Sequence, residues 1–132
     1  MDSCIFCKII KGEILSAKVW ENDEFLAFLS IAPINPGHTL VIPKRHVDYI
    51  FDMDDEELGR FMEVCKPISE ALKKAFNPKS GKIGIMVAGL EVPHAHIHLI
   101  PVNDEGDLNF DRAKSASSEE LEESAQKIKS FL

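Results

Sequence analysis

Three histidines at two-residue spacing, in the stretch Pro93-His94-Ala95-His96-Ile97-His98-Leu99-Ile100-Pro101, constrain the fold of this chain most strongly. Side chains alternate between the two faces of a β-strand, so this spacing places all three imidazoles on one face, about 6.5–7 Å apart. The apolar residues between them then face the core. On a helix the three would share no face, because each step would turn the side chain by about 200°. We therefore predict a strand that carries a histidine row (His94, His96 and His98) and is bounded by the flanking prolines.

The histidine row has three interpretations. The imidazoles are half-buried polar groups without a shared role, or ligands of one catalytic zinc ion with an open water position. In the third interpretation, one imidazole is a nucleophile that its two neighbours hold and tune. Same-face positions on one strand are spread too far for three nitrogens to converge on one ion. We therefore favour the nucleophile.

Composition indicates a single globular domain. The chain has 132 residues, of which 45% are hydrophobic and 28% charged, enough for a core of its own. A formal net charge of −7 argues against a nucleic-acid backbone as the main partner. No apolar stretch reaches about 18 residues and the start of the chain is polar, so we expect neither a membrane partner nor a signal peptide. Three cysteines without an export signal predict reduced thiols and a cytoplasmic protein.

The order of β-rich and helical segments predicts an α+β fold with an antiparallel sheet. Apolar spacing predicts a short helix over residues 4–10 and a long helix from Asp54, the expected N-cap with a capping-box glutamate, to Phe76. Pro67 is expected to kink the long helix. Ser117 should cap a last helix that packs as a surface flap. Strands are expected at residues 18–21, 24–30, 38–43, 82–87 and 94–100.

The chain resembles the histidine triad (HIT) family of nucleotidyl hydrolases and transferases. Residues 94–100 match the family's His-φ-His-φ-His-φ-φ signature, in which φ is apolar. Residues 36–44 look like the family's second block, and residues 4–10 look like its opening helix. Three blocks in the family's order make this resemblance highly specific.

The resemblance implies a HIT-like fold, in which a five-stranded antiparallel sheet carries a central helix and short N- and C-terminal helices. It implies one HIT domain over residues 1–132, with a core at about 4–103 and a helical extension at about 115–132. It also implies a homodimer in which the two sheets join, with a purine nucleotide bound in each subunit.

The family's chemistry implies catalytic roles for three histidines. His96 would attack the α-phosphorus of a purine nucleoside 5′-phosphoramidate or a related nucleotide and form a nucleotidyl-histidine, which water then hydrolyses. His98 and His38 would donate hydrogen bonds to the phosphate oxygens and orient His96. The alternatives are a dinucleoside polyphosphate hydrolase, a non-catalytic nucleotide-binding or scaffolding protein, and a zinc hydrolase that uses the row directly.

The resemblance also implies a nucleotide pocket, with two departures from the family. Ser30 stands where the family usually has Asp or Asn on the ribose hydroxyls, and Glu91 stands at a position that usually carries a hydroxyl. The backbone amide of Val92 would still serve the phosphate. The residues implied in nucleotide binding are Phe6, Ile9, Ile14, Ser30, Ile31, Leu40, Val92 and His98.

One branch of the family binds zinc, and its ligand positions correspond here to Cys4, Cys7, His46 and His94. A Cys₂His₂ set is a closed, structural site with no open position for catalysis. The competing interpretation is a pair of free thiols beside a surface histidine, because a lone Cys-x-x-Cys is a weak signal by itself. We expect structural zinc and no organic cofactor.

Overall fold

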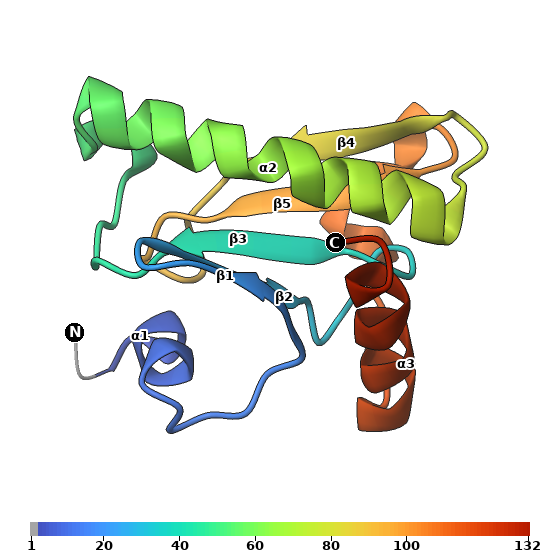
Figure 1. Cartoon of the computed structure of the whole chain (residues 1–132), viewed down its shortest axis with the longest axis horizontal. Coiled ribbons are helices and arrows are strands. Elements are labelled where there is room, and N and C mark those ends of the chain that lie inside the picture. The colour runs from blue at the N-terminus through green and yellow to red at the C-terminus, as the bar shows by residue number, and fades with distance from the viewer. Residues whose placement is uncertain (1–2) are drawn as a thin grey trace.

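A computed structural model describes residues 3–132 and contains one five-stranded sheet in the order β1-β2-β3-β5-β4 (Figure 1). All neighbouring strands are antiparallel, which confirms the predicted α+β fold. The strands are β1 (Lys18–Glu21), β2 (Phe25–Leu29), β3 (Thr39–Pro43), β4 (Lys82–Met86) and β5 (Ile97–Val102).

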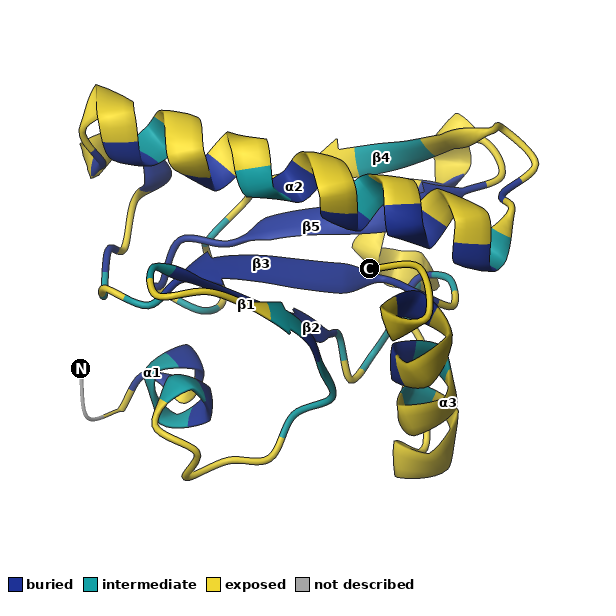
Figure 2. Cartoon of the chain, viewed as in Figure 1, coloured by how far each residue is buried: buried dark blue, intermediate teal, exposed yellow. Residues whose placement is uncertain are grey.

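Helices cover both faces of the sheet (Figures 1 and 2). The long α2 (Asp55–Phe76) lies across one face, and the short α1 (Ile5–Ile10) lies on the opposite side. The strands β2, β3 and β5 are buried between them, β1 and β4 are partly exposed, and α2 is buried only along the side that faces the strands (Figure 2). The site described below forms on the α1 side.

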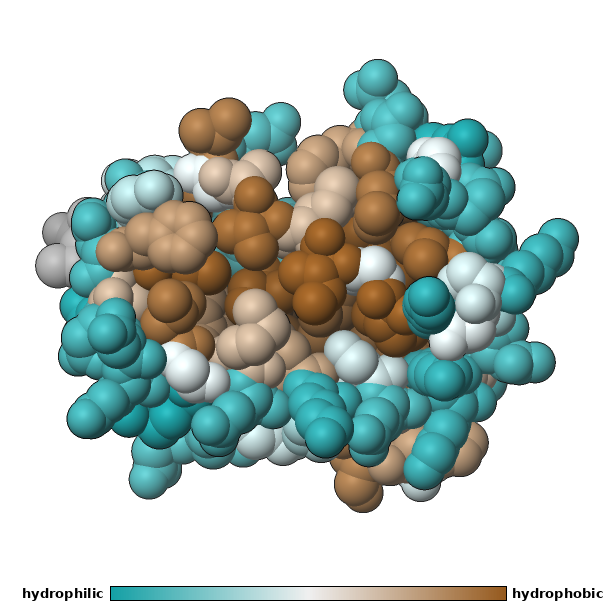
Figure 3. All heavy atoms as spheres, turned by 90° about the horizontal axis from the view of Figure 1, so that it is seen from above, coloured by the Kyte–Doolittle hydropathy of each residue, from teal (hydrophilic) through white to brown (hydrophobic). Residues whose placement is uncertain are grey.

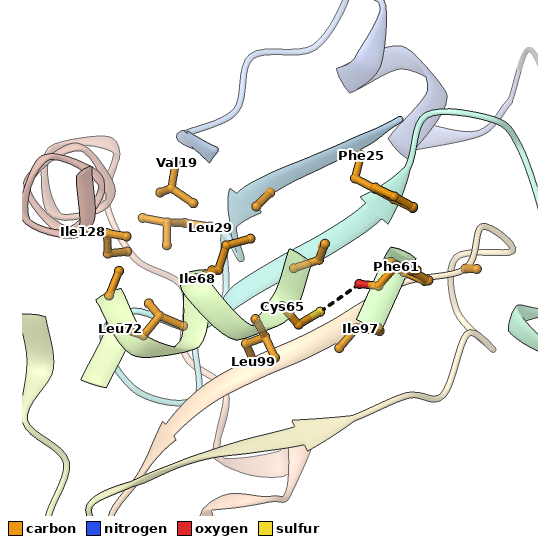
Figure 4. Packing of buried hydrophobic residues seen from close by; sticks show 14 of the residues in the cluster. Val19, Phe25, Leu29, Phe61, Cys65, Ile68, Leu72, Ile97, Leu99 and Ile128 are labelled. Carbon is orange, nitrogen blue, oxygen red and sulfur yellow. Dashed lines mark hydrogen bonds between the residues drawn. The ribbon is translucent and has the colours of Figure 1, made fainter. Parts of the chain in front are cut away.

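The alternation predicted around the histidine row is confirmed. Ala95, Ile97 and Leu99 are buried in the core on the α2 side, together with Phe61 and Ile68 of α2. Figure 4 shows this packing and the hydrogen bond of 3.4 Å that the Cys65 thiol donates to the Phe61 carbonyl. Cys65 is therefore a core residue, as its place in the apolar stripe of the helix predicts.

The predicted bounds of the last strand, residues 94–100, were wrong. β5 begins at Ile97 and continues through Pro101, which pairs with Ile83 of β4. A proline is tolerated there because β3 pairs with β5 only as far as Leu99, so no β3 carbonyl requires an N–H from residue 101. His94 and His96 consequently lie in the extended segment just before β5.

The N-terminus of α2 differs in detail from the prediction. Asp54 is the N-cap and accepts the Glu57 N–H at 2.8 Å. The Glu57 carboxylate does not return to the Asp54 amide; it accepts a bidentate pair from Arg45 at 2.6 and 3.3 Å. α2 continues through Pro67, which lies on the exposed side, so water can satisfy the carbonyl that lost its donor.

The prediction that the last helix is a surface flap was wrong. α3 (Ser118–Lys129) begins with the predicted capping box at Ser117, but its Ala125 and Ile128 are fully buried in the main core. Ile128 packs near Val19 of β1 and Leu72 of α2 (Figure 4). The apolar stripe of α3 is narrow, yet the small side chain of Ala125 lets the helix approach the main core closely.

Three short 3-10 helices complete the elements: η1 (Ile50–Asp52), η2 (Glu105–Asp107) and η3 (Phe110–Arg112). The last two lie between β5 and α3. Among the helices within residues 3–132, none has the length and apolarity that crossing a bilayer requires.

One face of the molecule carries exposed apolar side chains (Figure 3). They come from η1, α2, β4 and the loop after β4. A groove of about 1080 Å³, lined by η1, α2 and the loop after β4, reaches His96. We call this surface the apolar patch; its residues are Tyr49, Phe51, Met62, Ile85, Val87 and Leu90.

Candidate active site and metal centre

His96 is held so that one ring nitrogen is free to react. Its Nδ1 lies 2.7 Å from the carbonyl oxygen of His94. A carbonyl only accepts, so Nδ1 carries the proton and Nε2 of the neutral ring keeps its lone pair. Burial lowers the pKa of His96 below its ordinary value, which favours this neutral form. The arrangement suits an imidazole nucleophile.

A chain of hydrogen bonds fixes the tautomers of His38 and His98. The Ile34 N–H donates to His38 Nδ1 at 3.0 Å, so the proton of a neutral His38 is on Nε2. That Nε2 lies 2.9 Å from His98 Nδ1, which must therefore accept. Neutral His98 then carries its proton on Nε2. The pair thus presents an N–H donor from His98 beside the free nitrogen of His96, whose ring centroid lies 4.8 Å from that of His98.

Both members of this pair have pKa values lowered by burial, to about 4 for His38 and about 3 for His98. In the unfolded chain a histidine titrates near pH 6.5. Between the pKa of each histidine in the folded protein and pH 6.5, the unfolded chain binds more protons than the folded protein. The free energy of unfolding therefore falls as the pH decreases from about 6.5. The protonated rings would also break the Ile34–His38–His98 chain of acceptors.

We expect each histidine to contribute a slope of about 1.4 kcal/mol per pH unit in that window. Urea unfolding of the wild type and of His98→Asn at several pH values between 4.5 and 6 isolates the contribution of His98. In this variant the free energy of unfolding should depend less steeply on pH, by about the contribution of one histidine. Asparagine can accept a hydrogen bond from His38 but does not titrate. Equal slopes in the two proteins would contradict the lowered pKa of His98.

The four residues expected to bind zinc lie together. One ligand atom from each of Cys4, Cys7, His46 and His94 lies within 4.8 Å of the others. His94 Nδ1 lies 3.4 Å from Cys4 Sγ and 3.6 Å from Cys7 Sγ, and His46 Nδ1 lies 3.3 Å from Cys7 Sγ. Zn–S and Zn–N bonds of ordinary length give tetrahedral edges of about 3.3–3.8 Å. The donor set and its spacing therefore fit one tetrahedral zinc ion.

Contacts outside this cluster orient its ligands. The Nε2 of His94 lies 2.8 Å from the Pro43 carbonyl, which keeps the proton there and leaves Nδ1 as the donor toward a metal. Cys4 is the N-cap of α1 and its sulfur accepts the Cys7 N–H at 3.4 Å. The cluster thereby joins α1 to the segment that leads into β5.

The histidine row does not converge on one ion. His94 faces the cysteines, His96 bonds to a backbone carbonyl, and His98 bonds to His38. The three imidazoles therefore have three different partners. This geometry does not support a zinc hydrolase that uses the whole row.

The residues expected around the purine separate into two groups. Phe6 and Ile9 of α1 are buried together with Leu40 of β3, and Val92 packs against them. The edge of the Phe6 ring meets His96, with ring centroids 5.1 Å apart. By contrast Ile31 is 75% exposed.

The remaining positions of the implied nucleotide pocket lie at the surface or form a hydrogen bond with the backbone of a turn. Ile14 is 38% exposed and lies outside the buried group. The Ser30 hydroxyl accepts the Ala32 N–H at 3.2 Å and so stabilises the turn after β2. Glu91 is exposed in the loop before the row.

A comparison with family models matches residues 11–105 to the HIT domain. The chain belongs to the HIT family. This confirms the resemblance, including its Cys-x-x-Cys branch, whose two cysteines and two histidines the fold assembles.

Solved HIT structures share the fold. A HIT-like protein from Bartonella henselae superposes with a TM-score of 0.87 at 36% identity, over 100% of this chain and 98% of that one. A zinc-bound histidine triad protein from Mycobacterium smegmatis superposes with a TM-score of 0.82 at 27% identity, over 98% of this chain and 93% of that one.

The sequence is also similar to that of an enzyme. An adenosine 5′-monophosphoramidase of Saccharomyces cerevisiae is 45% identical over 106 residues, which are 78% of this chain and 65% of that protein.

Three residues that contact the triad or the segments around it were not predicted from the sequence: Phe110, Asp107 and Asn35. Phe110 lies on the His98 ring, with centroids 4.8 Å apart. Asp107 is buried and accepts a hydrogen bond of 3.0 Å from the Asn35 side chain. Nothing in the polar stretch after Pro101 signals this, because the contacts join segments far apart in the sequence.

Proposed function

We propose that this HIT protein hydrolyses purine nucleoside 5′-phosphoramidates, or related nucleotides with P–N, P–O or P–S linkages, through a nucleotidyl-histidine. One observation carries the proposal: the ring of His96, whose Nε2 is free, contacts the ring of His98, whose Nε2 carries a proton, with ring centroids 4.8 Å apart. A nucleophile next to a hydrogen-bond donor is what displacement at a phosphorus atom requires. The similarity to the yeast adenosine 5′-monophosphoramidase supports the choice of substrate class.

The reaction has two displacements. In the first, the lone pair of His96 Nε2 forms a bond to the α-phosphorus while the P–N bond of the substrate breaks, and the leaving nitrogen takes a proton from solvent and departs as ammonia. In the second, water attacks the phosphorus and gives up a proton to solvent, the bond to His96 breaks, and the nucleoside monophosphate leaves. His98, held by His38, donates to a non-bridging oxygen in both steps and stabilises the charge that develops there.

The nucleotide would lie across the α1 side of the sheet. Phe6, Ile9 and Leu40 would form the floor beneath the purine, with the exposed Ile14 and Ile31 as flexible walls that close on it. Ser30 would contact the ribose with a single hydroxyl, and the Val92 amide would donate to the phosphate. The set proposed for the site is His38, His96 and His98 with Phe6, Ile9, Ile14, Ser30, Ile31, Leu40 and Val92.

Product analysis tests this function. Incubation with adenosine 5′-phosphoramidate should give AMP and ammonia in equal amounts. A dinucleoside polyphosphate hydrolase would instead prefer diadenosine polyphosphates and release a nucleotide with additional phosphates. Binding of AMP without turnover of any of these compounds would favour the non-catalytic alternative, to which the Ser30 and Glu91 departures point.

We propose that Cys4, Cys7, His46 and His94 hold a structural zinc ion. The tetrahedral spacing of their donor atoms and the zinc-bound Mycobacterium smegmatis relative support this. Four protein ligands leave no position for a substrate, so the ion would supply rigidity to the segment that presents His96. Thiolate ligands need a reducing compartment, which agrees with a cytoplasmic location.

We also propose a homodimer in which the apolar patch of one copy packs against that of another. β4 is an edge strand of the sheet, and α2 contributes Met62 beside it. An exposed apolar surface of this kind next to an unpaired strand edge is typical of a protein interface. Because the groove from the patch reaches His96, the partner would complete the wall around the leaving group.

Charge substitutions test the dimer. Met62→Lys and Val87→Lys should each weaken self-association by about 100-fold or more, because the interface would have to bury an unpaired ammonium. Light scattering across a dilution series gives the molar mass. Leu15→Lys is the matched control, because Leu15 is 94% exposed yet lies outside the patch. A wild type that is monomeric at high concentration, or equal effects of all three variants, would contradict the proposal.

A further inference from the structure

The His98 ring is held by contacts from several elements. His38 bonds to its Nδ1, and the His96 ring lies against it along the strand. Leu40 of β3 and Met86 of β4 are its cross-strand neighbours. The remaining contact is Phe110, whose ring meets that of His98 at an interplanar angle of 60°. His98 is consequently only 8% exposed, although Phe110 itself is 45% exposed.

Phe6 and Phe110 stand at opposite ends of this arrangement. Phe6 meets the ring of His96, and Phe110 meets the ring of His98. Phe6 belongs to the α1 cluster that the purine pocket would use, whereas Phe110 comes from the segment after β5. The contact that Phe110 makes therefore lies where the phosphate of the nucleotide would bind, and not where its base would bind.

A buried carboxylate anchors the segment that carries Phe110. Asp107 accepts hydrogen bonds from the Asn103 N–H at 2.8 Å, from the Asn35 side chain at 3.0 Å and from Arg112 at 2.7 Å. The first and third contacts close residues 103–112 into a compact loop. Asp107 is only 7% exposed, and these donors hold the pKa of its carboxyl down to about 2. The anchor therefore stays charged and in place over the working pH range of the protein.

Asn35 connects this anchor to His38. Its side-chain amide donates both to Asp107 and, at 2.8 Å, to the Pro101 carbonyl of β5. Its backbone carbonyl accepts the His38 N–H at 3.1 Å. The same asparagine thus fixes the loop that presents His38 and the segment that presents Phe110. Both of these residues contact His98.

We propose that Phe110, anchored by Asp107 and Asn35, is a positioning residue that holds the His98 ring in the orientation in which Nδ1 accepts from His38 and Nε2–H faces the phosphate. The inference rests on the proposed function for its catalytic consequence, but the ring orientation can be measured without turnover. A 180° rotation of the ring would break the bond to His38 and turn a different edge toward the substrate. The contact between the Phe110 and His98 rings, whose centroids lie 4.8 Å apart, would hinder such a rotation.

Nitrogen NMR of histidine-labelled protein tests the orientation directly. In the wild type, His98 should show a protonated Nε2 and an unprotonated Nδ1. In Phe110→Ala, the spectrum should show a mixture of tautomers or exchange broadening at His98, while His96 keeps its protonated Nδ1. Phe110→Leu, which keeps apolar bulk without an aromatic edge, should lie between the two. Phe110→Tyr should restore the wild-type spectrum, because position 110 is half exposed and can place a hydroxyl in water.

Kinetics give the second readout. In Phe110→Ala, kcat should fall by about 3- to 10-fold, the size of an aromatic pair contact, while KM changes by less than about 2-fold. Phe131→Ala is the matched control, because Phe131 is 48% exposed, lies after α3 and contacts no part of the triad. It should leave both the spectrum and kcat unchanged.

The outcomes separate this inference from the proposed function. A wild type with an ordered His98 tautomer that Phe110→Ala disturbs, but without turnover, would overturn the function and leave the positioning role standing. An unchanged His98 spectrum in folded Phe110→Ala and Phe110→Leu would overturn the positioning role, whatever the activity. An equal loss of kcat in Phe131→Ala would overturn it as well, because the effect would then reflect general stability.

Discussion

Replacement of His96 by alanine is expected to lower the rate of adenosine 5′-phosphoramidate hydrolysis by on the order of 10⁴-fold or more. The variant loses the only atom on which the nucleotidyl intermediate can form, because His98 Nδ1 is engaged by His38 and His94 faces the cysteine cluster. A continuous assay of ammonia release, with the wild type at low concentration, measures the difference.

Two controls accompany this variant. His96→Ala should still bind AMP with a dissociation constant within about tenfold of the wild type, which shows that the pocket is intact. His98→Asn should lose less, about 10²- to 10³-fold, because it removes a stabilising donor but leaves the nucleophile. A His96→Ala protein with activity close to that of the wild type would rule out the assigned nucleophile.

Removal of zinc is expected to lower the midpoint of thermal unfolding by about 10–15 °C. The ion would join α1, the loop after β3 and the segment before β5, and without it α1 is tied to the other two through three weak thiol–imidazole contacts. The core on the α2 side has no part in the cluster, so the apoprotein should remain folded. Differential scanning calorimetry with and without a chelator measures the shift.

Cysteine variants provide the matched comparison. Cys4→Ser should abolish stoichiometric zinc and reproduce the lower midpoint, whereas Cys65→Ser should keep its zinc. Cys65 is buried in the other core, and burial raises its thiol pKa to about 12, so it has no tendency to supply a thiolate. Wild-type protein that contains far less than one zinc per chain, and takes up none when it is added, would contradict the metal site.

The features that the sequence predicts best are those carried by local periodicity. The two-residue spacing around His96 predicts the faces of β5 correctly, and the cap residues Asp54 and Ser117 predict where two helices begin. The predicted end of β5 was wrong because Pro101 was expected to end the strand. Whether a proline ends a strand depends on how far the neighbouring strand extends, which the chain's own pattern does not contain.

Contacts between distant segments account for the rest of the difference. Asn35 and Asp107 are 72 residues apart, and neither lies in a motif. The burial of Ile128 against β1 and α2 likewise depends on where the sheet leaves space. The difference between the three histidines also needed the fold: spacing alone gives three equivalent imidazoles, whereas in the structure His94 faces the cysteines, His96 bonds to a backbone carbonyl and His98 bonds to His38.

We expect His96 to become covalently nucleotidylated during turnover. Rapid acid-free quenching of a reaction with adenosine 5′-phosphoramidate, followed by proteolysis and mass spectrometry, locates the adduct. A substrate with a fast leaving group increases the fraction that is trapped, because the adduct then forms faster than water hydrolyses it. We predict AMP attached to the peptide that contains His96, formed and lost at rates that match turnover. AMP on another residue, or turnover without any covalent adduct, would contradict the account.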